Sequence, residues 1–511
     1  MQSRRDQVQA HLFVMGRLGA GMLRAEPDAP DTPTGRTNRG IRTGLYVGIA
    51  IAVVVGLYGV ISPGGATGWR KPGTLVVVKK TGARYLFLGG ELHPVLNQAS
   101  ARLLAGEKMQ FAEVSEKSLK GAPRGAPVGI VGAPDGLPSA GELSGDGWLA
   151  CGLPQAAPAP AGSAAPGQTP AGSAPAAAGA AAPQIALAVA MAAQGAALTD
   201  GQAVLVATPD GERHLLWQGQ RLRLDTRNGA LAALGYGAAT PYPVAAAFLN
   251  TLPAGPDLAP ADIPGRGGGG PVLAGHPTAV GQLFAGPAGE SYVLTREGLR
   301  ALSRTEFELL RGDPRTQREA YAGAPATAAP VGAADLAAHP ATAPAAAADP
   351  AGPGGGAALP AEPPRLLAPA SHQSVCAGLR PGAGGPATVV ALADTATVAG
   401  RPPAAQPGVE PTCADADRVM VRPGGGALVQ ALSGAGAAGA SYLVTDSGVK
   451  YPLPSADAAK RLGYGAARTV GVPAGLLKLL PTGPSLDPEA LAAGGVVSAA
   501  PAPPCSARNS G

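Results

Sequence analysis

The sequence predicts an α+β protein with one transmembrane helix followed by a duplicated outer domain, in which four small β-hairpin/helix repeat modules surround a central β core. Three observations lead to this prediction. Residues 44–62 form an uncharged apolar segment, a strand–turn–strand–helix pattern recurs four times after it, and the later part of the chain matches the earlier part at offsets between 207 and 228 residues.

The composition limits how much of the chain can form packed cores. Its 511 residues include 76 Gly and 54 Pro, and only 14% are charged and 4% aromatic. Runs of Ala, Gly and Pro cannot bury enough apolar surface to build a core. The formal net charge is +5, with Lys and Arg dispersed and no basic stripe interleaved with aromatics. Nucleic acid is therefore not expected as a partner.

Residues 1–43 are predicted to form a cytoplasmic amphipathic arm. Val8, Leu12 and Met15 recur at helical spacing, and Pro27 marks the end of the helix. One interpretation is that this apolar stripe docks on a cytoplasmic partner or on the membrane surface. The alternative is a frayed, solvated tail.

Residues 44–62 are predicted to be a transmembrane helix, because about 20 apolar residues span a bilayer core. A signal peptide is the competing interpretation, but its apolar region would be shorter and nearer the N-terminus. Arg36, Arg39 and Arg42 precede the segment. Positive charge favours the cytoplasmic side, so we expect a single-pass plasma-membrane protein with a cytoplasmic N-terminus and most of its mass outside.

Small residues recur every four positions along this segment, at Gly44, Gly48, Ala52 and Gly56. Such a stripe lets two membrane helices approach closely, which makes these residues candidates for helix packing. The alternative is that glycine is simply common in membrane helices.

Four copies of one pattern are predicted to form repeat modules, at residues 73–120, 201–268, 280–320 and 426–491. Each copy has two β-type runs separated by a glycine, followed by a helical segment. A glycine between alternating apolar runs indicates a hairpin, because it adopts positive φ without steric cost. The predicted turn glycines are Gly82, Gly211, Gly289 and Gly439.

The remaining outer residues are assigned to a central core in two parts, 121–200 and 365–425. The first part contains a Pro/Ala linker at 154–182, and an Ala/Pro/Gly linker at 322–364 precedes the second. These stretches, like residues 397–411, are predicted to be extended tethers or disordered insertions. The tail, 492–511, is predicted to be disordered.

The cysteines follow the same duplication as the repeats. The second and fourth copies are offset by 228 residues, the first and third by 207, and Cys151 and Cys376 by 225. If a pseudo-two-fold axis relates the halves, these two cysteines meet near it and form a disulfide, which stabilises the fold by about 4–5 kcal/mol in the chain-entropy model. The alternative is two free buried thiols. Cys413 and Cys505 are either free or paired with each other.

No motif for catalysis, cofactor or metal is present in the sequence. The phosphate-binding pattern GxxxxGK[ST] is absent, and so are GxSxG, HExxH and a calcium loop. The six histidines are scattered singly, and no CxxC occurs, so zinc is not expected. We expect no catalytic site and no cofactor.

Three motifs together resemble the EccB component of the type VII (ESX) secretion systems of actinobacteria. They are RRDQVQAH at 4–11, SPGG at 62–65 and LHPVLNQASARLL at 92–104, and PRGAPVGIVGAPDGLP at 123–138 adds to the match. The resemblance extends over nearly the whole chain except the Ala/Pro linkers.

The resemblance implies a structural and assembly subunit of the inner-membrane complex that exports proteins. Its implied partners are an EccC-type motor ATPase, EccD, EccE, a mycosin protease and further copies of the chain. Two alternatives come with the family. The repeats have been likened to a wall-binding module, which implies a peptidoglycan anchor, and the family is sometimes described as ATPase.

Overall fold

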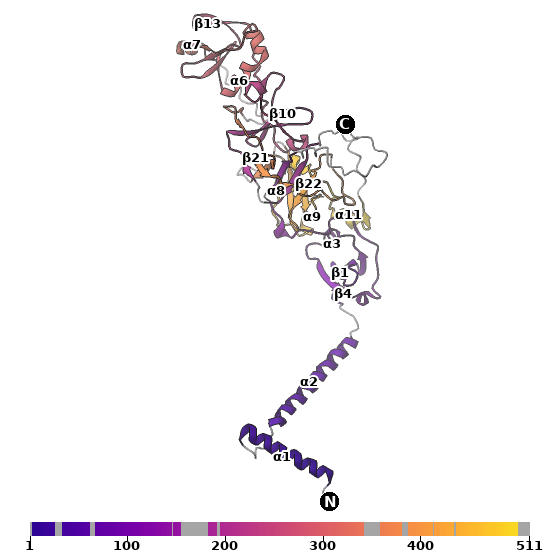
Figure 1. Cartoon of the computed structure of the whole chain (residues 1–511). Helices are drawn as coiled ribbons and strands as arrows, with labels where there is room; N and C mark the ends of the chain where they lie inside the picture. Colours follow the sequence, from indigo (N-terminus) through magenta and orange to yellow (C-terminus); the bar gives the residue numbers. More distant parts are fainter. Residues whose placement is uncertain are drawn as a thin grey trace, which may run out of the picture. The chain divides into compact units, whose positions relative to one another are not determined.

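The structure is a computed structural model that describes residues 3–25, 33–61, 67–145, 147–154, 182–191, 195–341, 358–380, 387–411, 413–433 and 436–498 (Figure 1). These residues belong to two compact units. Unit 1 contains residues up to Leu92 together with Phe111–Arg124, and unit 2 contains His93–Gln110 and everything from Gly125.

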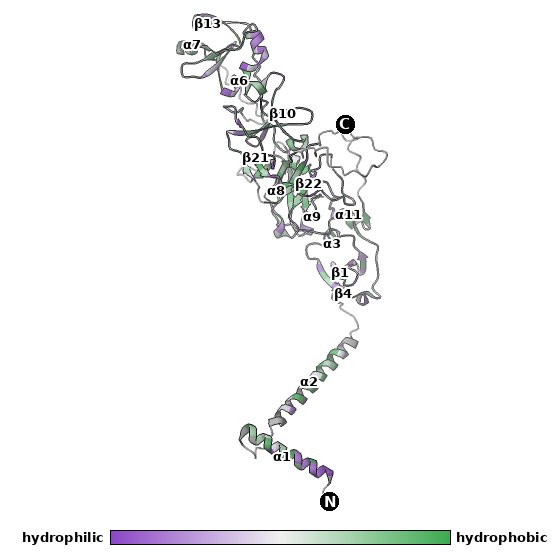
Figure 2. Cartoon of the chain, viewed as in Figure 1, coloured by the Kyte–Doolittle hydropathy of each residue, from purple (hydrophilic) through white to green (hydrophobic). Residues whose placement is uncertain are grey.

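Two helices begin unit 1. Helix α1 (Arg4–Arg24) starts at a capping box, in which the Ser3 hydroxyl accepts from the Asp6 backbone N–H and the Asp6 carboxylate accepts from the Ser3 N–H. Helix α2 (Pro33–Ile61) contains the apolar span, and Figure 2 shows its hydrophobic colouring.

Helix α2 begins eleven residues before the predicted start of the membrane segment. The part of α2 that is long and apolar enough to cross a membrane is Thr37–Tyr58. Arg39 and Arg42 therefore lie on the helix and not ahead of it. Nothing in TNRGIRT prevents helix formation, and Pro33 fits the first turn, where its missing N–H has no helical partner anyway.

The rest of unit 1 is organised around a sheet of order β3-β2-β1-β4. The bounds are β1 (Thr74–Val78), β2 (Arg84–Leu88), β3 (Glu91–Pro94), β4 (Gln110–Val114) and the 3₁₀ helix η1 (Glu116–Leu119). Trp69 is buried and its ring meets Phe87 edge-on at 5.4 Å between ring centroids. This small core is why residues 67–92 fold as a module despite their many charges.

A six-stranded sheet of order β22-β7-β6-β20-β21-β8 lies at the centre of unit 2. The bounds are β6 (Leu149–Gly152), β7 (Ile185–Val189), β8 (Ala196–Ala197), β20 (Gln373–Arg380), β21 (Ala387–Asp394) and β22 (Arg418–Val421). Strands β6 and β20 pair antiparallel in the middle, and Cys151 lies directly opposite Cys376.

Three further sheets in unit 2 share one topology, with a three-stranded antiparallel meander and a fourth strand that returns parallel to the first. The first contains β9 (Gln202–Ala207), β10 (Arg213–Trp217), β11 (Gln220–Arg223) and β12 (Tyr242–Pro243), and β19 (Arg365–Leu366) pairs with β9 as well. The second contains β15 (Leu283–Ala285), β16 (Ser291–Thr295), β17 (Gly298–Leu302) and β18 (Ala329–Pro330). The third contains β23 (Gly426–Leu432), β24 (Ala438–Thr445), β25 (Lys450–Leu453) and β26 (Val470–Pro473). With the sheet of unit 1, these sheets are called modules 1 to 4 in chain order.

Short helices and two ribbons complete unit 2. The helices are α3 (Gln98–Ala105), η2 (Ala140–Glu142), α4 (Ala230–Ala233), α5 (Ala246–Leu249), α6 (Arg304–Gly312), the π-helical turn η3 (Thr316–Ala320), α7 (Ala333–Ala338), α8 (Thr395–Val398), α9 (Ala456–Arg461), α10 (Ala474–Leu477) and α11 (Pro488–Ala492). The ribbons are β5 (Gly129–Ile130) with β27 (Val496–Val497), and β13 (Gly269–Leu273) with β14 (His276–Ala279).

The central sheet has two different faces, because side chains alternate along each strand. Trp148, Leu187 and Val375 belong to a large core that also takes in aliphatic residues of modules 2 and 4. Cys151, Ala186 and Cys376 belong to a smaller cluster on the other face, which includes Val398 of α8. Modules 2 and 4 thus pack on one face of the sheet, and the cysteines lie on the other.

Three of the four predicted turn glycines lie in hairpin turns with positive φ. The φ angles are +67° at Gly82, +87° at Gly211 and +88° at Gly289. The prediction for Gly439 is wrong, because this residue lies within strand β24. The turn of module 4 falls earlier, at Gly436 with φ +77°. The GAGAAGA stretch offers several glycines to the same turn, and spacing alone did not select the right one.

Parts of the predicted linkers are ordered elements. In 322–364, strand β18 pairs with β15 and helix α7 follows it, while residues 342–357 lie outside the described residues. In the tail from 492, Val496–Val497 forms strand β27. Strands β18 and β27 form by pairing with β15 and β5, and helix α7 by its own backbone hydrogen bonds, which need little from the side chains. Most of the 154–182 linker, residues 155–181, also lies outside the described residues.

Candidate functional site

The candidate docking residues of the arm lie on one exposed face of α1. Leu12 is 65% exposed and Met15 56% exposed, and Val8 is exposed one turn earlier. Residues spaced three and four apart share a helix face, so the three form a continuous apolar stripe. Within the described residues nothing covers this stripe.

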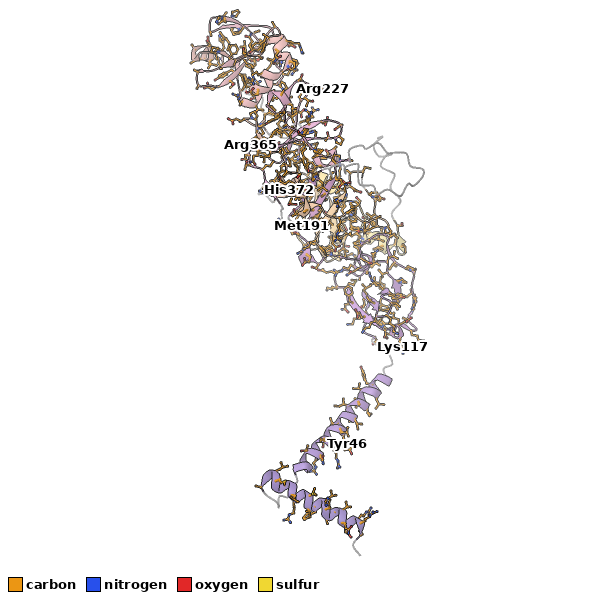
Figure 3. All side chains as sticks on the ribbon, in the orientation of Figure 1. Tyr46, Lys117, Met191, Arg227, Arg365 and His372 are labelled. Atoms are coloured by element: carbon orange, nitrogen blue, oxygen red, sulfur yellow. A yellow bond between two sulfur atoms is a disulfide. The ribbon has the colours of Figure 1, made fainter. Side chains whose placement is uncertain are left out.

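The small residues of α2 also lie on an open helix face. A Cβ added at Gly44, Gly48 or Gly56 would meet no atom of the described residues within 4 Å. Figure 3 shows the side chains of α2 standing clear of the ribbon, with Tyr46 labelled. A long helix with exposed Leu, Val and Ile around its whole surface suits lipid rather than water.

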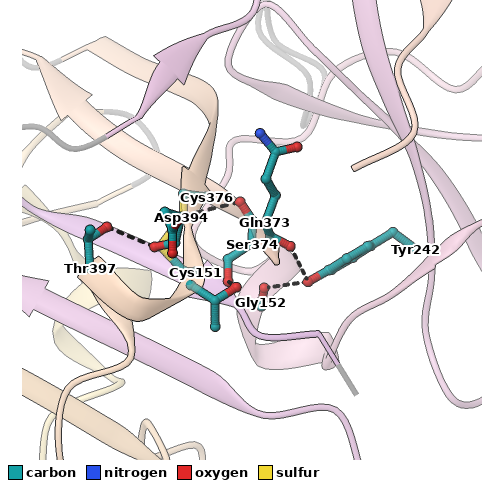
Figure 4. Close-up of a disulfide and its surroundings, with 9 residues drawn as sticks. Cys151, Gly152, Tyr242, Gln373, Ser374, Cys376, Asp394 and Thr397 are labelled. Atoms are coloured by element: carbon teal, nitrogen blue, oxygen red, sulfur yellow. Dashed lines mark hydrogen bonds between the residues drawn. A yellow bond between two sulfur atoms is a disulfide. The ribbon is translucent and has the colours of Figure 1, made fainter. Parts of the chain in front are cut away.

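Cys151 and Cys376 are joined by a disulfide across the middle of the central sheet, with their Cα atoms 4.0 Å apart (Figure 4). Nearby, the Tyr242 hydroxyl donates to the backbone oxygen of Gly152 at 3.0 Å and also reaches that of Gln373 at 3.5 Å. Burial raises the pKa of Tyr242, so this hydroxyl stays protonated and keeps donating. Module 2 is thereby linked to both strands that the disulfide joins.

The strand order around the disulfide shows how the two halves exchange strands. The β6–β7 hairpin of the first half lies beside the β20–β21 hairpin of the second, in antiparallel orientation. The next strand of each half then pairs with the other half: β8 with β21, and β22 with β7. A two-fold relation between the hairpins passes through the Cys151–Cys376 pair. The exchanged strands do not obey this two-fold relation, because β8 runs antiparallel to β21 whereas β22 runs parallel to β7.

Cys413 also takes part in a disulfide. The sequence left its state open between a free thiol and a pair with Cys505, and a free Cys413 is now excluded. Cys505 lies outside the described residues.

A buried ion pair that sequence inspection missed lies in module 3. Arg266 donates to the Asp313 carboxylate at 2.6 Å, and the two side chains are 4% and 0% exposed. Arg266 also donates to the Thr316 hydroxyl at 2.9 Å, and Arg315 donates to Asp313. Burial alone would raise the pKa of Asp313, but the hydrogen bonds from Arg266 and Arg315 outweigh it and hold that pKa below its ordinary value.

A second buried charge, Lys450, lies in module 4. Its Nζ donates to the backbone oxygens of Leu477 and Leu480, at and just after the C-terminal end of α10. Burial lowers the pKa of Lys450 to about 8.

Module 2 has a cation at the equivalent position. The backbone N–H of Lys450 donates to Pro481, and that of Arg221 donates to Pro253, both at 3.0 Å. Pro253 and Pro481 are separated by the 228-residue offset of the duplication. Arg221, which is half-buried, and Lys450 are themselves 229 residues apart, so the ungapped 228-residue offset aligns Arg221 with Val449 and does not reveal the match.

The described residues contain no cluster of three or more His, Cys, Asp or Glu side chains that could hold a metal ion. A polar groove lies beside the Gly211 turn of module 2, where acids alternate with Arg213, Arg223 and Arg227. Within it Arg223 pairs with Asp257 at 2.5 Å. Mixed charges that neutralise one another give no concentrated positive field for a nucleotide phosphate.

Comparison with known families identifies the family to which this architecture belongs. The family model described as "Type VII secretion system ESX-1, transport TM domain B" matches residues 1–497. The chain belongs to the EccB family.

Characterised relatives cover almost the full length of this EccB chain. It is 27% identical to the "ESX-3 secretion system ATPase EccB3" of Mycolicibacterium smegmatis, over 97% of this chain and 92% of the relative. It is also 27% identical to the "ESX-1 secretion system ATPase EccB1" of Mycobacterium tuberculosis, over 95% and 93%.

Solved EccB structures share the fold. The chain matches one in an intact ESX-5 inner-membrane complex with a TM-score of 0.60 and 21% identity, over 99% of this chain and 97% of that one. It matches the EccB3 dimer from the ESX-3 core complex with a TM-score of 0.60 and 24% identity, over 82% and 99%. The α+β fold, with one apolar helix ahead of a large β-rich domain, is therefore that of EccB.

Proposed function

We propose that this EccB chain is a structural and assembly subunit of a type VII secretion complex, and that it supports protein export across the plasma membrane without catalysing a reaction. The observation that supports this most directly is the combination of an uncovered apolar stripe on α1 with the single apolar span of α2. A capped helix of 21 residues with this stripe needs a partner to bury it.

The proposed orientation places the arm in the cytoplasm and modules 1 to 4 outside. Arg36, Arg39 and Arg42 at the start of α2 support it, because positive residues are retained on the cytoplasmic side. A disulfide at the centre of the sheet supports it too, since disulfides persist outside the reducing cytoplasm.

The partners that this function requires are a motor ATPase of the EccC type, EccD, EccE and a mycosin protease, together with further copies of the chain. The solved relatives support this choice, because one is part of an intact ESX-5 inner-membrane complex and another is an EccB3 dimer. The open face at Gly44, Gly48, Ala52 and Gly56 is proposed to pack against another membrane helix of that complex.

The arm provides the first test. Leu12→Asp and Met15→Asp each place a charge on the stripe, at a cost of several kcal/mol if it is buried in an interface. We expect the yield of complex recovered from mildly solubilised membranes to fall, while the outer domain stays folded. Ala10→Asp is the matched control, because residue 10 lies on the opposite side of α1 and should leave the yield unchanged. Unchanged assembly in both stripe variants would show that the arm is a solvated tail.

ATP hydrolysis is the rival function, because the names of the relatives contain the word ATPase. The sequence has no GxxxxGK[ST] motif to gather backbone amides and a Lys around a phosphate. ATP turnover that follows the purified chain through successive columns and is lost on one point substitution would favour the rival.

A further inference from the structure

Positive charge is concentrated in module 1, although Lys and Arg are dispersed over the sequence as a whole. Residues 67–92 and 111–124 contain eight Lys and Arg against three Asp and Glu, a net charge of +5. The whole chain has the same net charge, and unit 2 has a net charge of −3. Five of the nine lysines of the chain lie in these forty residues.

Four of these lysines lie at one end of the module 1 sheet. Lys79 and Lys80 follow β1, and Lys117 and Lys120 lie in and after η1, which follows β4. The Lys79 backbone N–H donates to the Val114 oxygen at 3.0 Å, so β1 and β4 end side by side. The four residues are called the lysine end, and Figure 3 labels Lys117 at the margin of the module.

The lysine end is available to a ligand. All four residues are exposed, and the structure gives none of their ammonium groups an ion pair within the described residues. Only Glu116 lies within the same turn, and it is itself exposed.

The covalent chain keeps module 1 close to the membrane. Only six residue steps separate Ile61, at the end of α2, from Thr67 at the start of the module. Even a fully extended chain of six residues reaches only about 22 Å. A module tethered this closely can bring its exposed lysines into the negative potential of anionic lipids, which extends about a Debye length, roughly 8–10 Å, from the surface.

We propose that the lysine end of module 1 binds anionic phospholipid headgroups in the leaflet at the C-terminal end of α2. The module then rests on the membrane and does not hang free from it. The proposal requires of the proposed function only that α2 spans a bilayer.

The test is acetylation of lysines in the full-length chain, embedded in lipid nanodiscs. Mass spectrometry measures the rate of acetylation at each lysine. Discs of phosphatidylcholine alone are compared with discs that contain about 30% phosphatidylglycerol, at about 0.05 M and about 0.5 M salt. We expect the rates at Lys79, Lys80, Lys117 and Lys120 to fall about threefold or more in anionic discs at low salt, and to recover at high salt. Exposed Lys460 and Lys478 of module 4 are internal controls whose rates should not change.

Variants make the expected result specific to the lysine end. Lys79→Gln combined with Lys80→Gln should also weaken the protection of Lys117 and Lys120, whereas Lys460→Gln should not. Equal rates in neutral and anionic discs would overturn the proposal. Protection that is the same in neutral and anionic discs but increases with protein concentration would also overturn the proposal. That result would indicate that the lysines contact the acidic surface of a second copy. A chain that fails to enter either disc would instead contradict the membrane span in the proposed function.

Discussion

At the scale of single residues, the buried charges of the modules are the positions where a substitution should matter most. Asp313 is buried and accepts from Arg266, which is buried too, and from the partly exposed Arg315. Removing one partner of a buried pair leaves the other charge uncompensated, which costs more than the pair itself contributes. These residues hold module 3 together.

Asp313→Asn should destabilise module 3 by about 3–5 kcal/mol, because Arg266 is left buried without its carboxylate. Hydrogen exchange of the α6 amides in the full chain measures this. Asp457→Asn is the control, because its pair with Arg461 is exposed and worth at most about 1 kcal/mol. Equal exchange rates in the two variants would contradict the role given to Asp313.

The same pair gives a dependence on pH whose sign follows from the depressed pKa of Asp313. Its contribution is fully present above the ordinary carboxyl pKa of about 4, and it is lost as the pH falls through the lower pKa of the folded state. The difference in stability between the native chain and Asp313→Asn should therefore shrink in acid.

The disulfide is the second residue-level prediction. Replacing Cys151 and Cys376 together by alanine should cost about 2–5 kcal/mol in the stability of the central sheet, measured as faster exchange of the β6 and β20 amides. A non-reducing peptide map gives the connectivity. A peptide that joins Cys151 to Cys413 or Cys505 would contradict both the pairing and the two-fold relation of the hairpins.

At the scale of elements, the turn glycines show what a spacing pattern can and cannot predict. Gly82, Gly211 and Gly289 each stand alone between two strands, so the pattern located their turns. In module 4 several glycines compete, and hydrogen bonds such as that from the Gly436 N–H to the Ser433 oxygen decide among them. The meander of each module could be predicted from alternation, but a returning strand such as β12 or β18 has only two residues and is too short to show a period.

Gly211→Ala should cost module 2 about 1–2 kcal/mol, because alanine resists a φ of +87° even though the space around the turn is open. Gly201→Ala is the matched control in the same module. That glycine has no positive φ and no atom within 4 Å of an added Cβ, so the substitution should be nearly neutral. Thermal unfolding of the two variants measures the difference, and equal midpoints would mean that the hairpin tolerates alanine at its turn.

At the scale of the whole molecule, the duplication could be predicted from the sequence but the strand exchange could not. Offsets of 225 and 228 residues indicated two halves and brought Cys151 and Cys376 together. They did not indicate that β8 and β22 would cross to the opposite half, since that depends on which sheet edge is free once the hairpins pair. Buried Asp313 and Lys450 escaped notice because a single charge in a sequence does not reveal its burial.

The exchange also bears on assembly. A sheet whose edge strands come from opposite halves cannot separate into those halves without unpairing β7 from β22 and β21 from β8. The two halves of unit 2 should therefore stay together as one body at the central sheet.

Removal of the chain from the cell tests the central claim most directly. The measurement is the mass of the complex that a tagged EccC-type motor ATPase brings out of membranes in mild detergent. Without this chain, the mass should fall to that of a smaller subcomplex and export should stop, and both should return when the chain is supplied again. A complex of full mass assembled in its absence would contradict the account.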